Sequence, residues 1–155
     1  MKITNRYTNA TIYEDASSTQ RETILAALAA KVSLSDANLS RADLSLIKAD
    51  LFAVLNAAPA EVPGLLAAVR EGRINGSKYE GECACLKGTI ANVRGCNIKE
   101  MQGVLADHPD SPSERWFLAI QIGDTPDKSQ VARITEEWIL EWGTKQAAQR
   151  EAVRG

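Results

Sequence analysis

The chain is poor in the residues that metal sites and nucleophilic catalysis need, and it lacks the long apolar run that membrane insertion needs. It has one histidine, three cysteines and 5% aromatic residues among 155 positions. An odd number of cysteines argues against the disulfide frameworks of small secreted proteins. The first residues are polar and lack a signal-peptide core, and no run of about 18 apolar residues exists to span a membrane. The sequence therefore predicts a soluble cytoplasmic protein with reduced thiols.

The charge balance narrows the class of ligand. Lysine and arginine number 18 against 20 aspartates and glutamates, which gives a formal net charge of −2. Long nucleic acids are normally bound by an excess of basic residues that neutralises several phosphates, so they are poor candidates here. A small ligand with one to three phosphates needs only a few arginines, so the net charge does not exclude it. The glycines match neither the P-loop nor the dinucleotide-binding pattern.

Catalytic and metal-binding signatures are equally weak. Cys83 and Cys85 are separated by one residue, which is too tight for the usual zinc knuckle. Cys83 or Cys96 with His108 would give a thiolate–imidazole pair, but nothing around them resembles a nucleophile signature. The glutamates of the last predicted helix fit a solvated face better than acid–base chemistry. The sequence predicts a protein without metal, cofactor or enzymatic activity.

Composition and patterning indicate one domain that is mainly α. Apolar residues make up 45% of the chain and charged residues 25%, the balance of a folded domain. Alternation of apolar and polar residues predicts a short β-hairpin over residues 2–14. Helical periodicity dominates residues 19–142, so residues 1–142 form a compact α+β domain. Residues 143–155 are predicted as a charged tail that either extends the last helix or frays.

Local signals place the helices of this domain. Thr19 and Glu22 have the spacing of a capping box at the start of the first helix. Ser113 is expected to cap a later helix that stops at Gly123. The predicted helices cover about 19–31, 41–57, 60–71, 83–93, 113–123 and 129–142.

Residues 32–51 are open to two interpretations. A pattern of small or apolar residue, polar residue and leucine recurs every five residues at first. It resembles the pentapeptide-repeat family, whose fold is a square β-solenoid, but the segment supplies only about one coil and a solenoid needs several. Alternatively, Ser40 caps a helix whose apolar stripe begins with Leu44 and Ile47. We favour the helix, over residues 41–57.

Arginines near aromatic residues are the best candidates for a ligand site. Arg94 follows a predicted helix rich in small residues, and Arg133 lies in the last helix. Arg115 directly precedes Trp116 and Phe117. Guanidinium groups match phosphate oxygens, and aromatic faces stack on nucleobases. Adjacent helical residues point about 100° apart, so we expect one ring in the core and the other against a ligand or second subunit.

Two stretches, residues 79–94 and 114–138, resemble small phage and prophage proteins. The first reads YEGECACLKGTIANVR, and the second contains ERWFLAI, GDTP and ARITEEW. Over residues 64–142 the chain is also similar to the first phage family of Thoeris anti-defence proteins, which act as nucleotide sponges. This resemblance implies a non-enzymatic homo-oligomer in the bacterial cytoplasm. It would trap a signalling nucleotide, either a cyclic ADP-ribose isomer or a cyclic oligonucleotide.

The same resemblance implies a site near subunit contacts, made of arginines, one aromatic ring and groups that bind ribose. The hairpin and an apolar stripe on the last helix would suit the oligomer interface; the stripe consists of Val131, Ile134, Trp138 and Trp142. The expected ligand-binding residues are Arg94, Arg115, Phe117, Asp124, Thr125 and Arg133, with Asp124 and Thr125 on ribose hydroxyls.

Two hypotheses of different classes follow from the sequence. The first is a phage counter-defence protein that sequesters a small phosphate-bearing nucleotide. The second is an inhibitor that contacts a host enzyme directly, as a DNA mimic or anti-CRISPR protein does. Asp36, Asp43 and Asp50 would form part of an acidic face, although Arg41 and Lys48 interrupt it.

Overall fold

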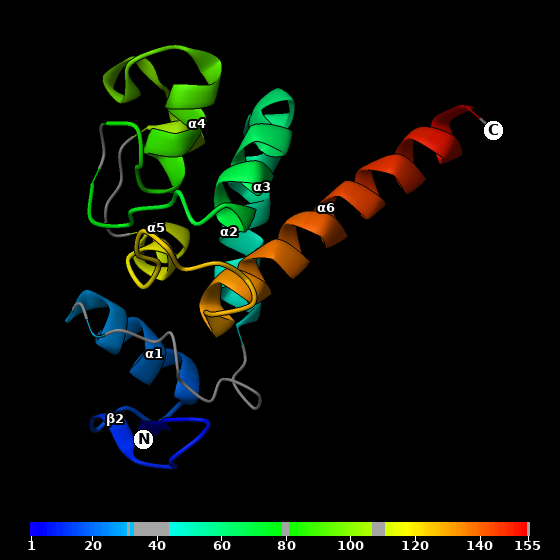
Figure 1. Cartoon of the computed structure of the whole chain (residues 1–155). Coiled ribbons are helices and arrows are strands. Elements are labelled where there is room, and N and C mark those ends of the chain that lie inside the picture. Colours follow the sequence, from blue (N-terminus) through cyan, green and yellow to red (C-terminus); the bar gives the residue numbers. More distant parts are fainter. Residues whose placement is uncertain (31, 33–43, 79–80, 107–110, 155) are drawn as a thin grey trace.

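The helices of the chain surround a core of leucine, isoleucine and tryptophan side chains, and a two-stranded hairpin closes one end (Figure 1). The computed structural model describes residues 1–30, 32, 44–78, 81–106 and 111–154. The predicted cap at Ser40 and the solenoid alternative over residues 33–43 lie outside the described residues. The described part is mainly α with one antiparallel hairpin, which confirms the predicted fold class.

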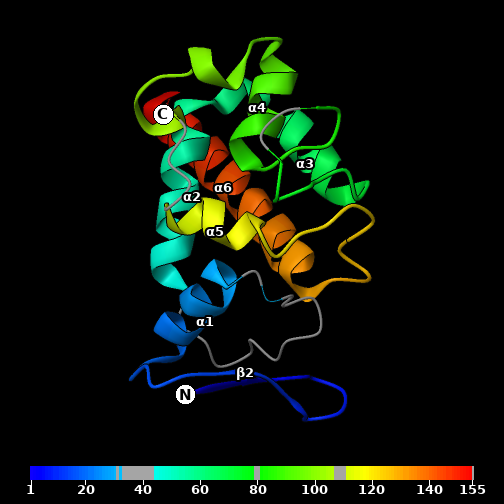
Figure 2. The same cartoon turned by 90° about the vertical axis from the view of Figure 1, so that its left-hand side faces the viewer.

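The hairpin consists of β1 (Lys2–Thr4) and β2 (Thr11–Glu14), as the alternation predicts. Asn9 adopts a left-handed backbone in the connecting turn, with φ of 61°, a conformation that asparagine tolerates better than most residues. The side chain of Ile3 is fully buried. A lone hairpin is marginal in water, and this one is stabilised because it packs on the first helix (Figure 2).

The first helix, α1 (Gln20–Ala29), begins at the predicted capping box. The Thr19 hydroxyl accepts the backbone N–H of Glu22 at 3.2 Å, and the Glu22 carboxylate accepts the Thr19 N–H at 3.3 Å. These two bonds satisfy donors that every helix leaves open at its N-terminus. The predicted start of this helix is confirmed, whereas its end at Ala29 comes before the predicted residue 31.

Two helices follow with a sharp bend between them. α2 (Ser45–Ala57) buries its apolar stripe, so the helical prediction is confirmed over the described part of that segment. The short 3₁₀ turn η1 (Pro59–Glu61) redirects the chain into α3 (Val62–Arg70). Pro59 cannot continue α2 because it lacks a backbone N–H.

The next helix, α4 (Leu86–Arg94), begins three residues later than predicted and ends where Gly95 takes a left-handed φ of 78°. A glycine at this position ends a helix without the steric cost that a Cβ would add. Two 3₁₀ turns, η2 (Ile98–Glu100) and η3 (Gly103–Leu105), follow it.

The fifth helix, α5 (Pro112–Phe117), is shorter than predicted and starts earlier. Ser111 is its N-cap residue, so the prediction that Ser113 caps it is wrong. The backbone N–H of Ser113 instead donates to the Asp50 carboxylate of α2 at 2.9 Å. The predicted continuation to Gly123 is also wrong, because the carbonyl of Ile120 accepts the N–H of Gly76 at 3.0 Å.

The last helix, α6 (Gln130–Arg154), is 25 residues long. It includes the predicted helix 129–142 except its first residue. It also continues through residues 143–154, so of the two alternatives predicted for the tail, the one that extends the last helix is confirmed. Its C-terminal half runs away from the rest of the chain (Figure 1). By length and composition, no single described helix can cross a membrane, although the segment of α2, η1 and α3, bent by 98°, passes that test as a unit.

Candidate functional site

The aromatic part of the predicted nucleotide site lies in the core. Phe117 and Trp116 both have no exposed surface, so the expectation that one of them meets a ligand is wrong. A buried ring offers no face to a nucleobase in this conformation. Trp116 packs against Trp138 with ring centroids 5.2 Å apart, and its indole N–H donates to the Thr135 hydroxyl at 2.8 Å.

Arg94 is held by a carboxylate of its own chain. Its Nε donates to Oε1 of Glu61 at 2.7 Å, which ties the end of α4 to η1. This hydrogen bond holds the pKa of the Glu61 carboxyl below its usual value. Glu61 is largely buried, and a buried carboxylate needs such a partner. Arg94 therefore has a structural role in this conformation.

The remaining predicted residues lie on separate elements. Arg115 is half-buried on α5, whereas Arg133 is exposed on α6. In the turn after α5, the Asp124 carboxylate accepts the N–H of Gln121 at 3.0 Å, and the Thr125 hydroxyl donates to the Asp127 carboxylate. None of the six predicted residues lines any of the three cavities described below.

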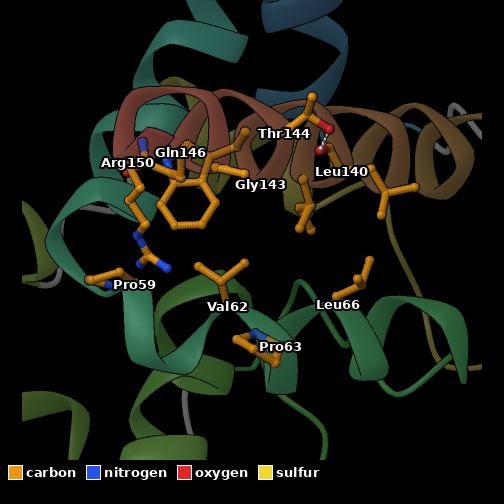
Figure 3. Close-up of a pocket in the computed structure, with 12 residues that line it drawn as sticks. Pro59, Val62, Pro63, Leu66, Leu140, Gly143, Thr144, Gln146 and Arg150 are labelled. Carbon is orange, nitrogen blue, oxygen red and sulfur yellow. Dashed lines mark hydrogen bonds between the residues drawn. The ribbon is translucent and has the colours of Figure 1, made fainter. Parts of the chain in front are cut away.

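The largest of these cavities is a cleft between α3 and the C-terminal half of α6, named here the α3–α6 groove (Figure 3). It has a volume of about 560 Å³. Val62, Pro63 and Leu66 form one wall, and side chains of α6 face them (Figure 3). The described residues that line it are Pro59, Val62, Pro63, Leu66, Ile139, Leu140, Trp142, Gly143, Thr144, Gln146, Ala147 and Arg150.

The walls of the α3–α6 groove are apolar and open to solvent. Leu140 is 44% exposed, and Pro63 is also exposed. Trp142 is fixed at the back, because its indole N–H donates to the Asn56 side chain of α2 at 2.8 Å. Among the described residues that line the groove, Arg150 alone is charged, and it points toward Pro59 at one end of the groove (Figure 3). The groove is therefore suited to an apolar surface with an anionic group at one end.

Gly143 lies in the middle of α6 and in the lining of the groove. A glycine inside a helix costs about 0.5–1 kcal/mol relative to alanine. Apart from the adjoining backbone of α6 itself, no described atom lies within 4 Å of the point where its Cβ would be. The space above this residue is therefore open, and the backbone of another chain can approach it closely.

The groove continues along α6 as a shallower hollow of about 290 Å³. Gln146, Gln149, Arg150 and Val153 line it, and Val153 is 88% exposed. The two cavities share Gln146 and Arg150. One face of α6 thus presents a continuous uncovered surface from Leu140 to Val153.

A third cavity, of about 420 Å³, lies where the loop after α3 meets the chain that follows α5. Its lining includes Asn75, Ser77 and Gln121, but the Asn75 side chain already accepts hydrogen bonds from Ser77. No charged residue is among the described residues that line it, and these offer no counterion for a phosphate.

A buried polar cluster joins α4 to α5. The backbone N–H of Lys87 donates to the Glu114 carboxylate at 3.0 Å, and its ammonium donates to the carbonyl of Ala106 at 2.8 Å. Burial, with a smaller contribution from Glu114, raises the pKa of the Cys85 thiol to about 12. A protonated thiol is a poor nucleophile, so the cluster locks the two helices together rather than presenting a reactive cysteine.

The stripe predicted as an oligomer interface packs inside the chain instead. Val131, Trp138 and Trp142 are buried, and Ile134 is partly buried against the same core. Sequence reasoning missed the opposite, exposed face of α6. The sequence signal for this face is the alternating spacing of three and four residues that places Leu140 on one face with positions 143, 147 and 150.

Metal ligands do not converge within the described parts of the chain. No group of three histidine, cysteine, aspartate or glutamate side chains there is arranged to hold an ion. The cysteines Cys83, Cys85 and Cys96 are free thiols, and His108 lies outside the described residues. Comparison with known proteins gives no significant match to a protein-family model, a curated protein or a solved structure.

Proposed function

We propose that this chain is a non-enzymatic binding protein whose α3–α6 groove receives an amphipathic helix of a protein partner. The observation that carries the proposal is the open apolar groove itself, with Leu140 at 44% exposure in its wall. Exposed apolar residues that line a groove often mark a site of protein interaction. The proposal follows the interaction-protein hypothesis and moves its site away from the acidic residues.

A helix is the occupant that the shape of the groove favours. The walls are themselves two helices, α3 and α6, with apolar side chains facing each other across the gap (Figure 3). A third helix laid between them buries anchors spaced by three and four residues, the common mode of helix-in-groove recognition. Arg150 at one end of the groove favours a partner helix with an acidic residue near the matching end.

The lining argues against a nucleotide as the natural occupant of this groove. Of its twelve residues, only Arg150 carries a charge. A cyclic dinucleotide or an ADP-ribose isomer brings at least two phosphates, and each buried phosphate requires charge-assisted hydrogen bonds. Apolar walls favour the aliphatic side chains of a peptide instead.

The test is a selection of helical peptides from a displayed library on the intact protein. We expect enriched peptides to carry apolar residues at i, i+3 or i+4, and i+7. Their affinity should fall at least about tenfold for Leu140→Glu, because a central anchor contact is replaced by a desolvated charge. The matched control is Leu46→Glu on α2, since Leu46 is 48% exposed and does not line the groove.

The outcomes separate the two hypotheses. Cyclic ADP-ribose, added as a competitor, should leave a selected peptide in place. Displacement by the nucleotide, or equal peptide affinity for Leu140→Glu and Leu46→Glu, would contradict helix binding in the groove. A selection that enriches no peptide family would contradict it as well.

A further inference from the structure

The exposed face of α6 has the spacing of a helix-pairing seam. Glu136, Leu140, Gly143, Ala147 and Arg150 are separated alternately by four and three residues. This alternation keeps side chains on one face of a helix along its length. Leu140, Gly143, Ala147 and Arg150 are exposed, and the Glu136 side chain, whose carboxylate accepts a hydrogen bond from Nε of Arg70 on α3 at 2.8 Å, is 22% exposed. We name these five residues the α6 seam.

The charges along α6 are separated by sign. Residues 130–141 hold one arginine against three glutamates, a formal net charge of −2. Residues 143–154 hold one lysine and two arginines against one glutamate, a formal net charge of +2. The seam shows the same polarity, with Glu136 at one end and Arg150 at the other. Such a helix is complementary to an antiparallel copy of itself.

The middle of the seam is small. Gly143 has no protein atom within 4 Å of its absent Cβ, and Ala147 lies one turn further on. Small residues at a helix crossing let two backbones approach closely, which increases the number of packing contacts. A mid-helix glycine, which weakens an isolated helix, is therefore explained by a second helix against it.

The projecting half of α6 has little packing of its own, apart from Lys145 over the Phe52 ring and Gln146 beside the Asn56 side chain of α2. Within 143–153 only Gln146 is partly covered, and the segment 143–154 extends about 18 Å at 1.5 Å per residue. Most helical stability in proteins comes from burying one face, and isolated helices of this length are marginal in water. A covering partner supplies what the single chain does not.

We propose that two copies of this chain pair reciprocally, each placing its α6 on the α6 seam and in the α3–α6 groove of the other. The inference rests on the proposed function, because it names the first helix that the groove receives. The two helices run antiparallel and cross at Gly143. Glu136 of each copy then lies beside Arg150 of the other, and Leu140 beside Ala147. Closed two-fold symmetry uses the same patch on both copies.

A parallel arrangement of the same helices is disfavoured by charge. It would place Glu136 beside Glu136 and Arg150 beside Arg150 of the second copy. Like charges at facing positions destabilise a helix pair, whereas the antiparallel arrangement forms two opposite-charge pairs. The orientation is therefore part of the proposal and can be tested directly.

Engineered cysteines test both the pairing and its direction. In a background of Cys83→Ser and Cys96→Ser, which removes the two half-buried thiols, we expect Gly143→Cys to form an intermolecular disulfide on mild oxidation. A mixture of Glu136→Cys and Arg150→Cys chains should also cross-link. Either variant alone should not, because its two thiols would be about 20 Å apart along the antiparallel helices.

Sedimentation equilibrium of charge variants that keep the native cysteines gives a second readout. Arg150→Glu should weaken dimerisation about tenfold, because it converts two attractive pairs into two repulsive ones. Adding Glu136→Arg and Arg70→Glu to Arg150→Glu should restore the dimer, since the pairs between copies and the Arg70–Glu136 pair within each chain are then all reversed together. A monomer at all concentrations, or cross-linking of Arg150→Cys alone, would overturn the proposal.

These outcomes are distinguishable from failure of the proposed function. A monomeric protein that still selects groove-binding peptides would refute self-pairing and leave helix recognition intact. A cross-linked antiparallel dimer, together with peptide binding that is insensitive to Leu140→Glu, would support the pairing and refute groove recognition of other helices.

Discussion

The variant Gly76→Ala is expected to lose at least about 3 kcal/mol of unfolding free energy. A Cβ at this position would lie 1.8 Å from the carbonyl oxygen of Phe117 and 2.5 Å from its carbonyl carbon. Both are backbone atoms at the end of a buried helix, so neither can move aside as a flexible side chain would. Urea unfolding followed by circular dichroism measures the loss.

The matched control is the same substitution at Gly143, where no atom lies within 4 Å of the added Cβ. Gly143→Ala should leave the isolated chain unchanged or stabilise it by about 0.5–1 kcal/mol, because alanine favours the helix. Gly76→Ala is therefore expected to destabilise the isolated chain, and Gly143→Ala is not. Equal effects of both would contradict the close approach of the loop after α3 to α5.

The variant Trp116→Ala is expected to lose about 3–5 kcal/mol of unfolding free energy. Trp116 has no exposed surface, and its ring packs against Trp138 with centroids 5.2 Å apart. Removing the indole leaves a large cavity, and it deprives the Thr135 hydroxyl of a donor at 2.8 Å. The measurement is the denaturant midpoint at constant m-value.

Trp116→Phe separates the two contributions to this loss. Phenylalanine keeps most of the packed area but has no indole N–H, so we expect a clearly smaller loss than for alanine. Unfolding free energies of Trp116→Ala and Trp116→Phe that are equal would show that the cavity is not the main cause. A loss below about 1 kcal/mol for alanine would contradict the burial of this side chain.

Local signals in the sequence predicted the ends and faces of several elements. The capping box at Thr19 and Glu22 forms as its spacing predicts, because both of its hydrogen bonds lie within one turn. Gly95 ends α4 because glycine tolerates a positive φ, a property of that one residue. Features of this kind depend on a few neighbouring residues and not on the tertiary fold.

Tertiary packing decided the position of Phe117. Adjacent helical residues do point in different directions, which led to the prediction that either Trp116 or Phe117 would face outward. α5 contacts α1, α2 and α4 (Figure 2), and Trp116 packs against Trp138 of α6. A helix enclosed on several sides buries residues all round. The number of neighbours around a short helix is not encoded in its own sequence.

Long-range pairing likewise decided the role of Arg94. Its partner Glu61 is 33 positions away, on a 3₁₀ turn that the sequence did not predict. Without that partner, an arginine at a helix end is a reasonable phosphate ligand. The α3–α6 groove was missed for a related reason, because it exists only where two helices distant in sequence diverge.

Amide hydrogen exchange across residues 143–154, measured over a range of protein concentrations, tests most directly whether the exposed half of α6 is a binding surface. We predict protection that increases with concentration, because pairing covers a helix end that the single chain leaves unpacked. Fast exchange in this segment at every concentration, with no added protection, would contradict the proposal that the exposed half of α6 is a binding surface.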